Sequence, residues 1–127
     1  MTNYDLEEAE LITLQIVLSV VLLFTTIISI TLSYDFLMKL EKKEPLYAEE
    51  EATDILIFNR LVMFVVAIIF IYINIRDKSV KEKYNSEDEF ADLQILASVF
   101  SFIAALIVLY VGIKSGSNIT PEENPTI

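Results

Sequence analysis

The sequence predicts an all-α integral membrane protein with three transmembrane helices, short charged loops and a disordered C-terminal tail. Hydrophobic residues make up 54% of the 127 residues, and the mean hydropathy is +0.55, which is too apolar for an ordinary soluble domain. The apolar residues also gather in three long runs. All three prolines lie outside these runs, so each run can form an unbroken helix.

The three runs have the length that a membrane crossing requires. Residues 11–34 carry no charge and would form a helix about 36 Å long, which exceeds the roughly 30 Å hydrocarbon core. Residues 55–75 form a second run that is interrupted by few polar side chains, and residues 93–113 form a third, uncharged run. The remaining segments are an acidic N-terminal tail (1–10), two charged loops (35–54 and 76–92) and a tail that we expect to be disordered (114–127).

Charged residues in the loops follow one rule. Acidic residues precede each predicted span and basic residues follow it, which complements the helix macrodipole without any ligand. The loop of residues 35–54 begins with a helical pattern whose apolar side chains suit the membrane interface, so we expect an interfacial helix there. Pro45 is expected to end that helix.

Three spans place the two termini on opposite sides of the membrane. Apart from Arg60, four lysines and arginines fall on each side, so the positive-inside rule gives little discrimination. The first span has no base before it and three lysines after it, which favours an outside N-terminus and an inside C-terminus. We therefore expect a multi-pass protein of the plasma membrane in that orientation, and a dual orientation stays open.

Small and polar side chains form a stripe on the first and third spans, at intervals of three and four residues. Such a stripe lets membrane helices approach closely and form hydrogen bonds, so we predict a helix-packing face. The alternative is a polar lining for a pore or a solute. Residues 8–20 and 87–99 are identical at seven of thirteen positions, through either an internal repeat or chance. The predicted face comprises Gln15, Ser19, Thr26, Ser29 and Ser33 on the first span and Gln94, Ser98, Ser101, Ala105 and Gly112 on the third.

The second span carries the intramembrane polar residues Asn59, Arg60 and Asn74. A charge at mid-membrane costs roughly 2.5 to 3.5 kcal/mol, and the three spans contain no acidic residue that would pair with Arg60. We therefore expect the Arg60 side chain to extend toward the lipid headgroups, with Asp54 or Asp35 as its intramolecular partner. The alternative is a role for Arg60 in transport.

Several classes of function are disfavoured by composition. A net charge of −10 argues against nucleic acid as a partner, because nucleic-acid surfaces select lysine and arginine. The chain has no histidine, no cysteine and no glycine-rich phosphate loop, so the commonest nucleophile–base pairs cannot form. The acidic clusters lack the glycine turn of a calcium loop. We expect no catalytic residues, no cofactor and no metal.

The residues do not specify an activity, but they favour interaction over chemistry. We expect a small protein of the lipid bilayer that acts as an accessory subunit or assembly factor through helix–helix packing. Its partner would be a second copy of itself or a larger membrane protein. A small oligomeric transporter or channel is the alternative. Proton-coupled transport would require an acid at mid-membrane, and the three spans contain none.

Overall fold

The computed structural model describes residues 2–86 and 88–115, which form three long α-helices and, within these ranges, no strand. The helices are α1 (Asn3–Leu40), α2 (Glu49–Lys83) and α3 (Ala91–Ser115). Each is long and apolar enough to cross a membrane, which confirms the predicted fold class of an all-helical, multi-pass membrane protein. Residues 114 and 115 of the predicted tail belong to α3, and the rest of that tail lies outside the described residues.

The helices extend beyond the apolar runs into the charged segments that flank them. α1 begins at Asn3, where the Thr2 hydroxyl accepts a hydrogen bond from the Asp5 N–H at 3.1 Å and the Asp5 carboxylate accepts one from the Thr2 N–H at 3.2 Å. This capping box satisfies two N–H groups at the start of the helix. With 38 residues, α1 is about 57 Å long, so it extends well beyond a hydrocarbon core of roughly 30 Å.

The predicted interfacial helix is the last part of α1 rather than a separate element. α1 ends at Leu40, five residues before the proline that was expected to stop it. The chain turns because Lys42 adopts a left-handed conformation with φ of 57°, and the Lys43 N–H donates to the Met38 carbonyl at 2.9 Å. These contacts cap the C-terminus of the helix. Glycine is the usual residue at the left-handed position of such a cap, but this chain has lysine there.

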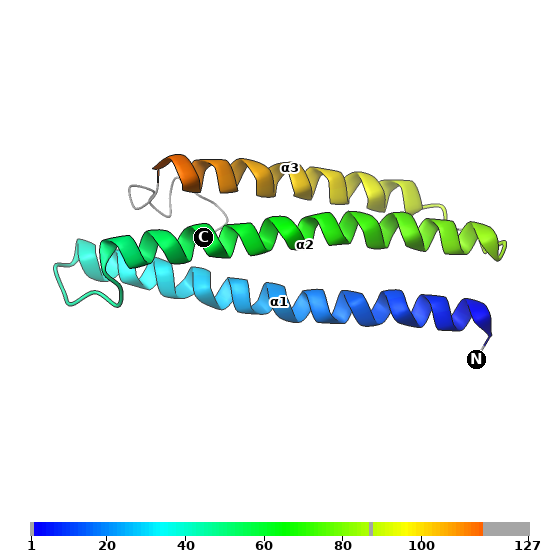
Figure 1. Cartoon of the computed structure of the whole chain (residues 1–127), viewed down its shortest axis with the longest axis horizontal. Coiled ribbons are helices and arrows are strands. Elements are labelled where there is room, and N and C mark those ends of the chain that lie inside the picture. The colour runs from blue at the N-terminus through cyan, green and yellow to red at the C-terminus, as the bar shows by residue number, and fades with distance from the viewer. Residues whose placement is uncertain (1, 87, 116–127) are drawn as a thin grey trace.

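α2 lies between α1 and α3, and neighbouring helices run antiparallel (Figure 1). α2 packs against both neighbours, whereas α1 and α3 do not pack against each other within the described ranges. Among the helices that the structure describes, each outer helix therefore packs against α2 alone. Their remaining sides expose large apolar side chains, which suits contact with lipid.

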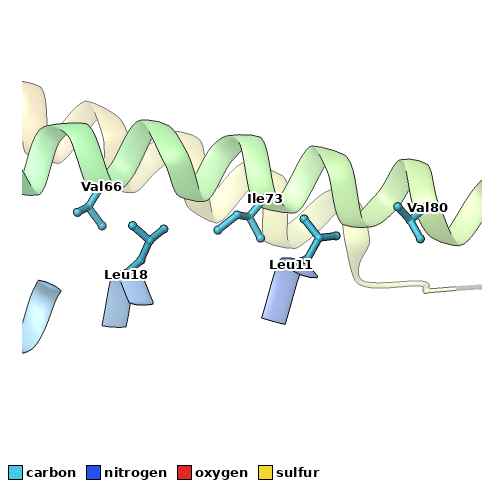
Figure 2. Packing of buried hydrophobic residues seen from close by; sticks show 5 residues of the cluster. All are labelled: Leu11, Leu18, Val66, Ile73 and Val80. Carbon is cyan, nitrogen blue, oxygen red and sulfur yellow. The ribbon is translucent and has the colours of Figure 1, made fainter. Parts of the chain in front are cut away.

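The seam between α1 and α2 is built from aliphatic side chains seven residues apart. Leu11 and Leu18 of α1 point toward Val66, Ile73 and Val80 of α2, and all five are buried (Figure 2). A seven-residue spacing keeps the same face of each helix against its partner, as in left-handed coiled coils and many membrane bundles.

The seam between α2 and α3 relies on small residues instead. Within the apolar runs, Arg60 and Asn74 of α2 make polar contacts with α3. The buried small positions of α3 again recur every seventh residue, which lets the two backbones approach closely. These positions are Ala91, Ser98, Ala105 and Gly112.

Ion pairs join the chain segments that emerge at the N-terminal end of α1. Glu7 contacts Arg76 at 3.7 Å and Lys83 at 3.3 Å, and Lys78 contacts Asp92 at 2.6 Å. These partly exposed pairs contribute little stability individually, at about 0 to 1 kcal/mol each. They do place the N-terminal segment and the connection between α2 and α3 at the same end of the bundle.

Candidate functional site

An open groove of about 550 Å³ runs over α2 between α1 and α3. The α3 side of the groove extends from Gln94 to Val108, which corresponds to about 21 Å of helix. On the α1 side the groove is bordered by Leu22. Its floor is Met63, Val66, Ala67, Phe70 and Asn74, and its α3 wall is Gln94, Ala97, Ser98, Ser101, Ala104, Ala105 and Val108.

The predicted face of α3 is divided between the seam and the groove. Ser98, Ala105 and Gly112 are buried at the seam with α2, and Ser98 and Ala105 also border the groove. Gln94 and Ser101 are exposed and line the groove. The stripe of small side chains on α3 therefore contributes to both the seam and the groove, because α2 covers only part of the stripe.

The predicted face of α1 lies only partly on the seam with α2. Ser29 is buried, Gln15 and Ser33 are half-buried, and Ser19 and Thr26 are exposed. The Ser19 hydroxyl donates to the Gln15 carbonyl of its own helix at 2.8 Å. Spacings of three and four residues put Ser19 and Thr26 on the same side of α1 as Leu22. Of this side of α1, however, only Leu22 lines the groove.

Asn59 connects α2 to α1. Its Nδ2 donates to the Ser29 hydroxyl oxygen at 3.1 Å and to the Thr25 carbonyl at 3.2 Å. The Ser29 hydroxyl itself donates to the Thr25 carbonyl at 3.0 Å. Sequence reasoning did not include Thr25, although its place seven residues after Leu18 is a signal for the buried face.

Asn74 connects α2 to α3 at one end of the groove. Its Nδ2 donates to the Ser98 hydroxyl oxygen and, at 3.4 Å, to the Gln94 carbonyl. The Ser98 hydroxyl donates to the same carbonyl at 2.9 Å. Two residues of the predicted α3 face thereby bind one of the predicted intramembrane polar residues.

The Arg60 side chain does not lie where the sequence predicted. Only 1% of the residue is exposed, and its Nη1 donates to the Val108 carbonyl at 2.7 Å. The side chain therefore lies against α3 instead of extending to the headgroups. Neither predicted acidic partner pairs with Arg60, and Asp35 binds Lys39 at 2.9 Å. The reason is Gly112, whose missing side chain leaves space for the guanidinium.

Asp35 is a polar anchor that the sequence did not reveal. It is 2% exposed, and its carboxylate accepts a hydrogen bond from the Tyr47 N–H at 2.9 Å. The Tyr47 hydroxyl donates to the Thr31 hydroxyl at 3.1 Å. Together these contacts fasten the connection between α1 and α2 onto the end of α1.

A charged cluster follows the apolar run of α2. Lys81 lies 3.0 Å from Asp77 and 3.1 Å from Asp88. The hydrogen bonds from Lys81 and from the Phe90 N–H lower the pKa of Asp88. Burial, together with neighbouring Asp77, raises the pKa of Glu8, which precedes the apolar run of α1. Among the described residues, no group of three potential ligands is placed to hold a metal ion.

Comparison with known proteins adds no relative: no protein-family model, curated protein or solved structure matches this chain. A function is therefore inferred from the structure, above all from the groove, its polar contacts and the buried arginine.

Proposed function

We propose that this protein is an accessory subunit or assembly factor without catalysis of its own, and that its groove receives a transmembrane helix of the partner. The observation that carries this proposal is the groove itself, which is open along about 21 Å of helix between two outer helices that do not touch. That length covers most of a hydrocarbon core of roughly 30 Å.

The side chains along the groove support a helix as its occupant. Ala97, Ser101 and Ala104 are exposed on the groove side of α3, where short side chains permit a close backbone approach. Ile103 and Ile107, by contrast, are exposed large side chains of α3 that do not line the groove. Small residues on one side and large ones on the other are the expected pattern for a packing face beside a lipid face.

Filling the groove tests the proposal. The tagged protein, extracted in mild detergent at native expression, is expected to travel with a partner in fixed ratio, as measured by sizing and mass spectrometry. Ala104→Phe should remove the partner, because the ring occupies the groove. Ile107→Phe adds bulk outside the groove and should retain it. Loss of the partner from neither variant, or equally from both, would refute the groove as the binding surface.

The alternative is a small oligomeric transporter or channel, which the polar groove residues Asn74, Gln94 and Ser101 favour. In that case the same extraction yields a homo-oligomer without a foreign partner. Reconstitution of that oligomer into liposomes would then produce solute flux.

We also infer that the protein resides in the plasma membrane with its N-terminus outside. The three lysines after the first span and the absence of bases before it support this orientation. Because the chain has no cysteine, single cysteines report on topology directly. In intact cells, an impermeant thiol reagent should label Ser86→Cys and leave Glu44→Cys unlabelled. The reverse pattern would invert the orientation, and labelling of both would indicate dual insertion.

A further inference from the structure

Arg60 is the one charged residue within the three apolar runs, and it is buried between α2 and α3. Its Nη1 donates to the Val108 carbonyl at 2.7 Å. A Cβ atom on Gly112 would lie 3.0 Å from Nη1 and 3.2 Å from Cδ of Arg60. The α2–α3 seam therefore has space for an arginine at this position because α3 has a glycine opposite it.

The other edge of the guanidinium has no hydrogen-bond partner among residues 2–86 and 88–115. Nε and Nη2 of Arg60 are both buried and make no hydrogen bond to the described part of the chain. These two nitrogens direct their N–H groups from the same edge of the planar group, which is an edge that binds a carboxylate through two parallel hydrogen bonds. Burying charged N–H groups without an acceptor is costly, so this edge is suited to an anion.

The described part of the chain does not supply that anion. Asp35 is engaged by Lys39 and by the Tyr47 N–H, and no ion pair joins Asp54 to Arg60. A second copy of the chain also has no acidic side chain at this depth, because residues 11–34, 55–75 and 93–113 contain no Asp or Glu. Neither the described residues nor the apolar runs of a second copy supply this anion, which leaves a different molecule as the source that we test.

We propose that Arg60 pairs with a carboxylate on a membrane-spanning helix of a different protein. This inference rests on the proposed function and specifies the chemistry of the partner. Arg60 lies five residues after Ile55, about 7 to 8 Å into the apolar run. The partner's Asp or Glu lies at the same depth, at the membrane face where α1 ends and α2 begins. A lipid phosphate belongs to the headgroup layer outside the hydrocarbon core, so the depth favours a carboxylate.

Pairing requires the guanidinium edge to become accessible. This edge is covered in the structure, and Val108, whose carbonyl accepts the bond from Arg60, lines the groove. The proposal therefore requires the Arg60 side chain to turn from the seam toward the groove as the partner docks. The single bond to the Val108 carbonyl is then exchanged for two parallel hydrogen bonds to the carboxylate, whose negative charge also pairs with the guanidinium. The partner thus relieves the unpaired charge that the isolated protein carries.

A synthetic transmembrane peptide tests this pairing. The probe is a leucine–alanine helix with one Glu five residues from each end, so that either orientation presents a carboxylate at the required depth. A matched peptide carries Gln at both positions. In neutral phosphatidylcholine vesicles at mildly alkaline pH, energy transfer to the labelled full chain should show association with the Glu peptide that is tighter by on the order of tenfold or more. Equal association of the two peptides, or of neither, would overturn the proposal.

Variants of the chain test whether Arg60 causes the preference for the Glu peptide. Arg60→Gln should abolish the preference for the Glu peptide, and Arg60→Lys should retain only part of it because lysine has no bidentate edge. Lys114→Gln, a charge change at the same membrane face, should keep the full preference. Far-ultraviolet circular dichroism establishes that each variant is folded. A full preference in Arg60→Gln would exclude Arg60 as the binding residue.

Two further outcomes would assign the anion elsewhere. Native mass spectrometry that finds a phospholipid retained by the wild type and lost from Arg60→Gln would replace the protein carboxylate with a lipid phosphate. Glu122 and Glu123 are removed in a chain that ends at Ser115. If that chain shows a clearly stronger preference for the Glu peptide than the full chain, a tail carboxylate already occupies Arg60 in the full chain and the proposal fails. Loss of partner from Ala104→Phe but not from Arg60→Gln would uphold the proposed function and refute only this inference.

Discussion

Asn59 and Asn74 make the same contact with different helices. Each donates from Nδ2 to a serine hydroxyl and to the carbonyl four residues before that serine. The serines are Ser29 on α1 and Ser98 on α3. Since the two asparagines lie toward opposite ends of the apolar run of α2, one polar contact fixes each neighbouring helix at a different depth.

The first prediction concerns the contact between Asn59 and Ser29. Unfolding in detergent of Asn59→Leu, Ser29→Ala and the double variant should give a coupling energy of about 0.6 kcal/mol, the average for polar contacts between membrane helices. Combining Asn59→Leu with Ser98→Ala is the control, because these residues belong to separate contacts and should give additive effects. Additive effects for Asn59 and Ser29 as well would show that this hydrogen bond contributes nothing measurable.

The three spans could be predicted from the sequence because a membrane crossing depends on length and apolarity, which are local properties. The helix ends were less predictable. The charged residues before 11 and after 75 suggested tails and loops, yet α1 begins at Asn3 and α2 ends at Lys83. Ion pairs such as Glu7 with Lys83 bring these extensions together, and such pairing between distant segments is not visible in local composition.

The face through which each helix packs was harder to predict. Apolar residues occur on all sides of each span, so the sequence gives little preference for one face. On α1, the polar stripe suggested Ser19 and Thr26, but the buried seam includes Leu11 and Leu18. The position of Arg60 depended on Gly112, which is 52 residues away in the sequence. That relation exists only when α2 and α3 are antiparallel and in register.

The second prediction is that Gly112→Ala destabilises the protein through Arg60. The new Cβ would lie 3.0 Å from Nη1 and 3.2 Å from Cδ, so the guanidinium has to move. Overpacking costs about 1 to 3 kcal/mol, and the better helix propensity of alanine offsets about 1 kcal/mol of it, so we expect a net cost of about 0 to 2 kcal/mol in thermal unfolding in detergent. In an Arg60→Ala background the cost should nearly vanish. A cost that is independent of residue 60 would place the strain elsewhere on α3.

The third prediction concerns the anchor at Asp35. Asp35→Leu leaves the Tyr47 N–H without its acceptor, which should cost about 1 to 3 kcal/mol and release the connection between α1 and α2. Asp35→Asn retains a side-chain oxygen for that N–H and loses only the pair with Lys39, so its effect should be smaller. Hydrogen exchange at Tyr47 measures the difference. Equal exchange in the two variants would mean that the contact does not hold the connection.

The fourth prediction is a pH dependence at Glu8, outside the apolar run of α1. Burial and the nearby Asp77 raise the pKa of Glu8 above its usual 4.5, so this carboxyl favours its protonated form in the folded protein. A raised folded-state pKa adds stability that is fully present below the unfolded-state pKa and is lost as the pH rises through the folded-state value. At neutral pH the ionised Glu8 therefore opposes folding, even though Lys81 offsets part of the repulsion.

Glu8→Gln should consequently raise the midpoint of thermal unfolding by a few degrees at neutral pH, because the amide has no charge to desolvate beside Asp77. The difference from the wild type should shrink as the pH falls toward 4.5, where the wild-type carboxyl takes up its proton. Glu10→Gln is the matched control, since Glu10 is exposed on the same helix and should give little change at either pH. A Glu8→Gln stabilisation that is constant with pH would contradict ionisation as its cause, because only the charged form of Glu8 interacts unfavourably with burial and with Asp77.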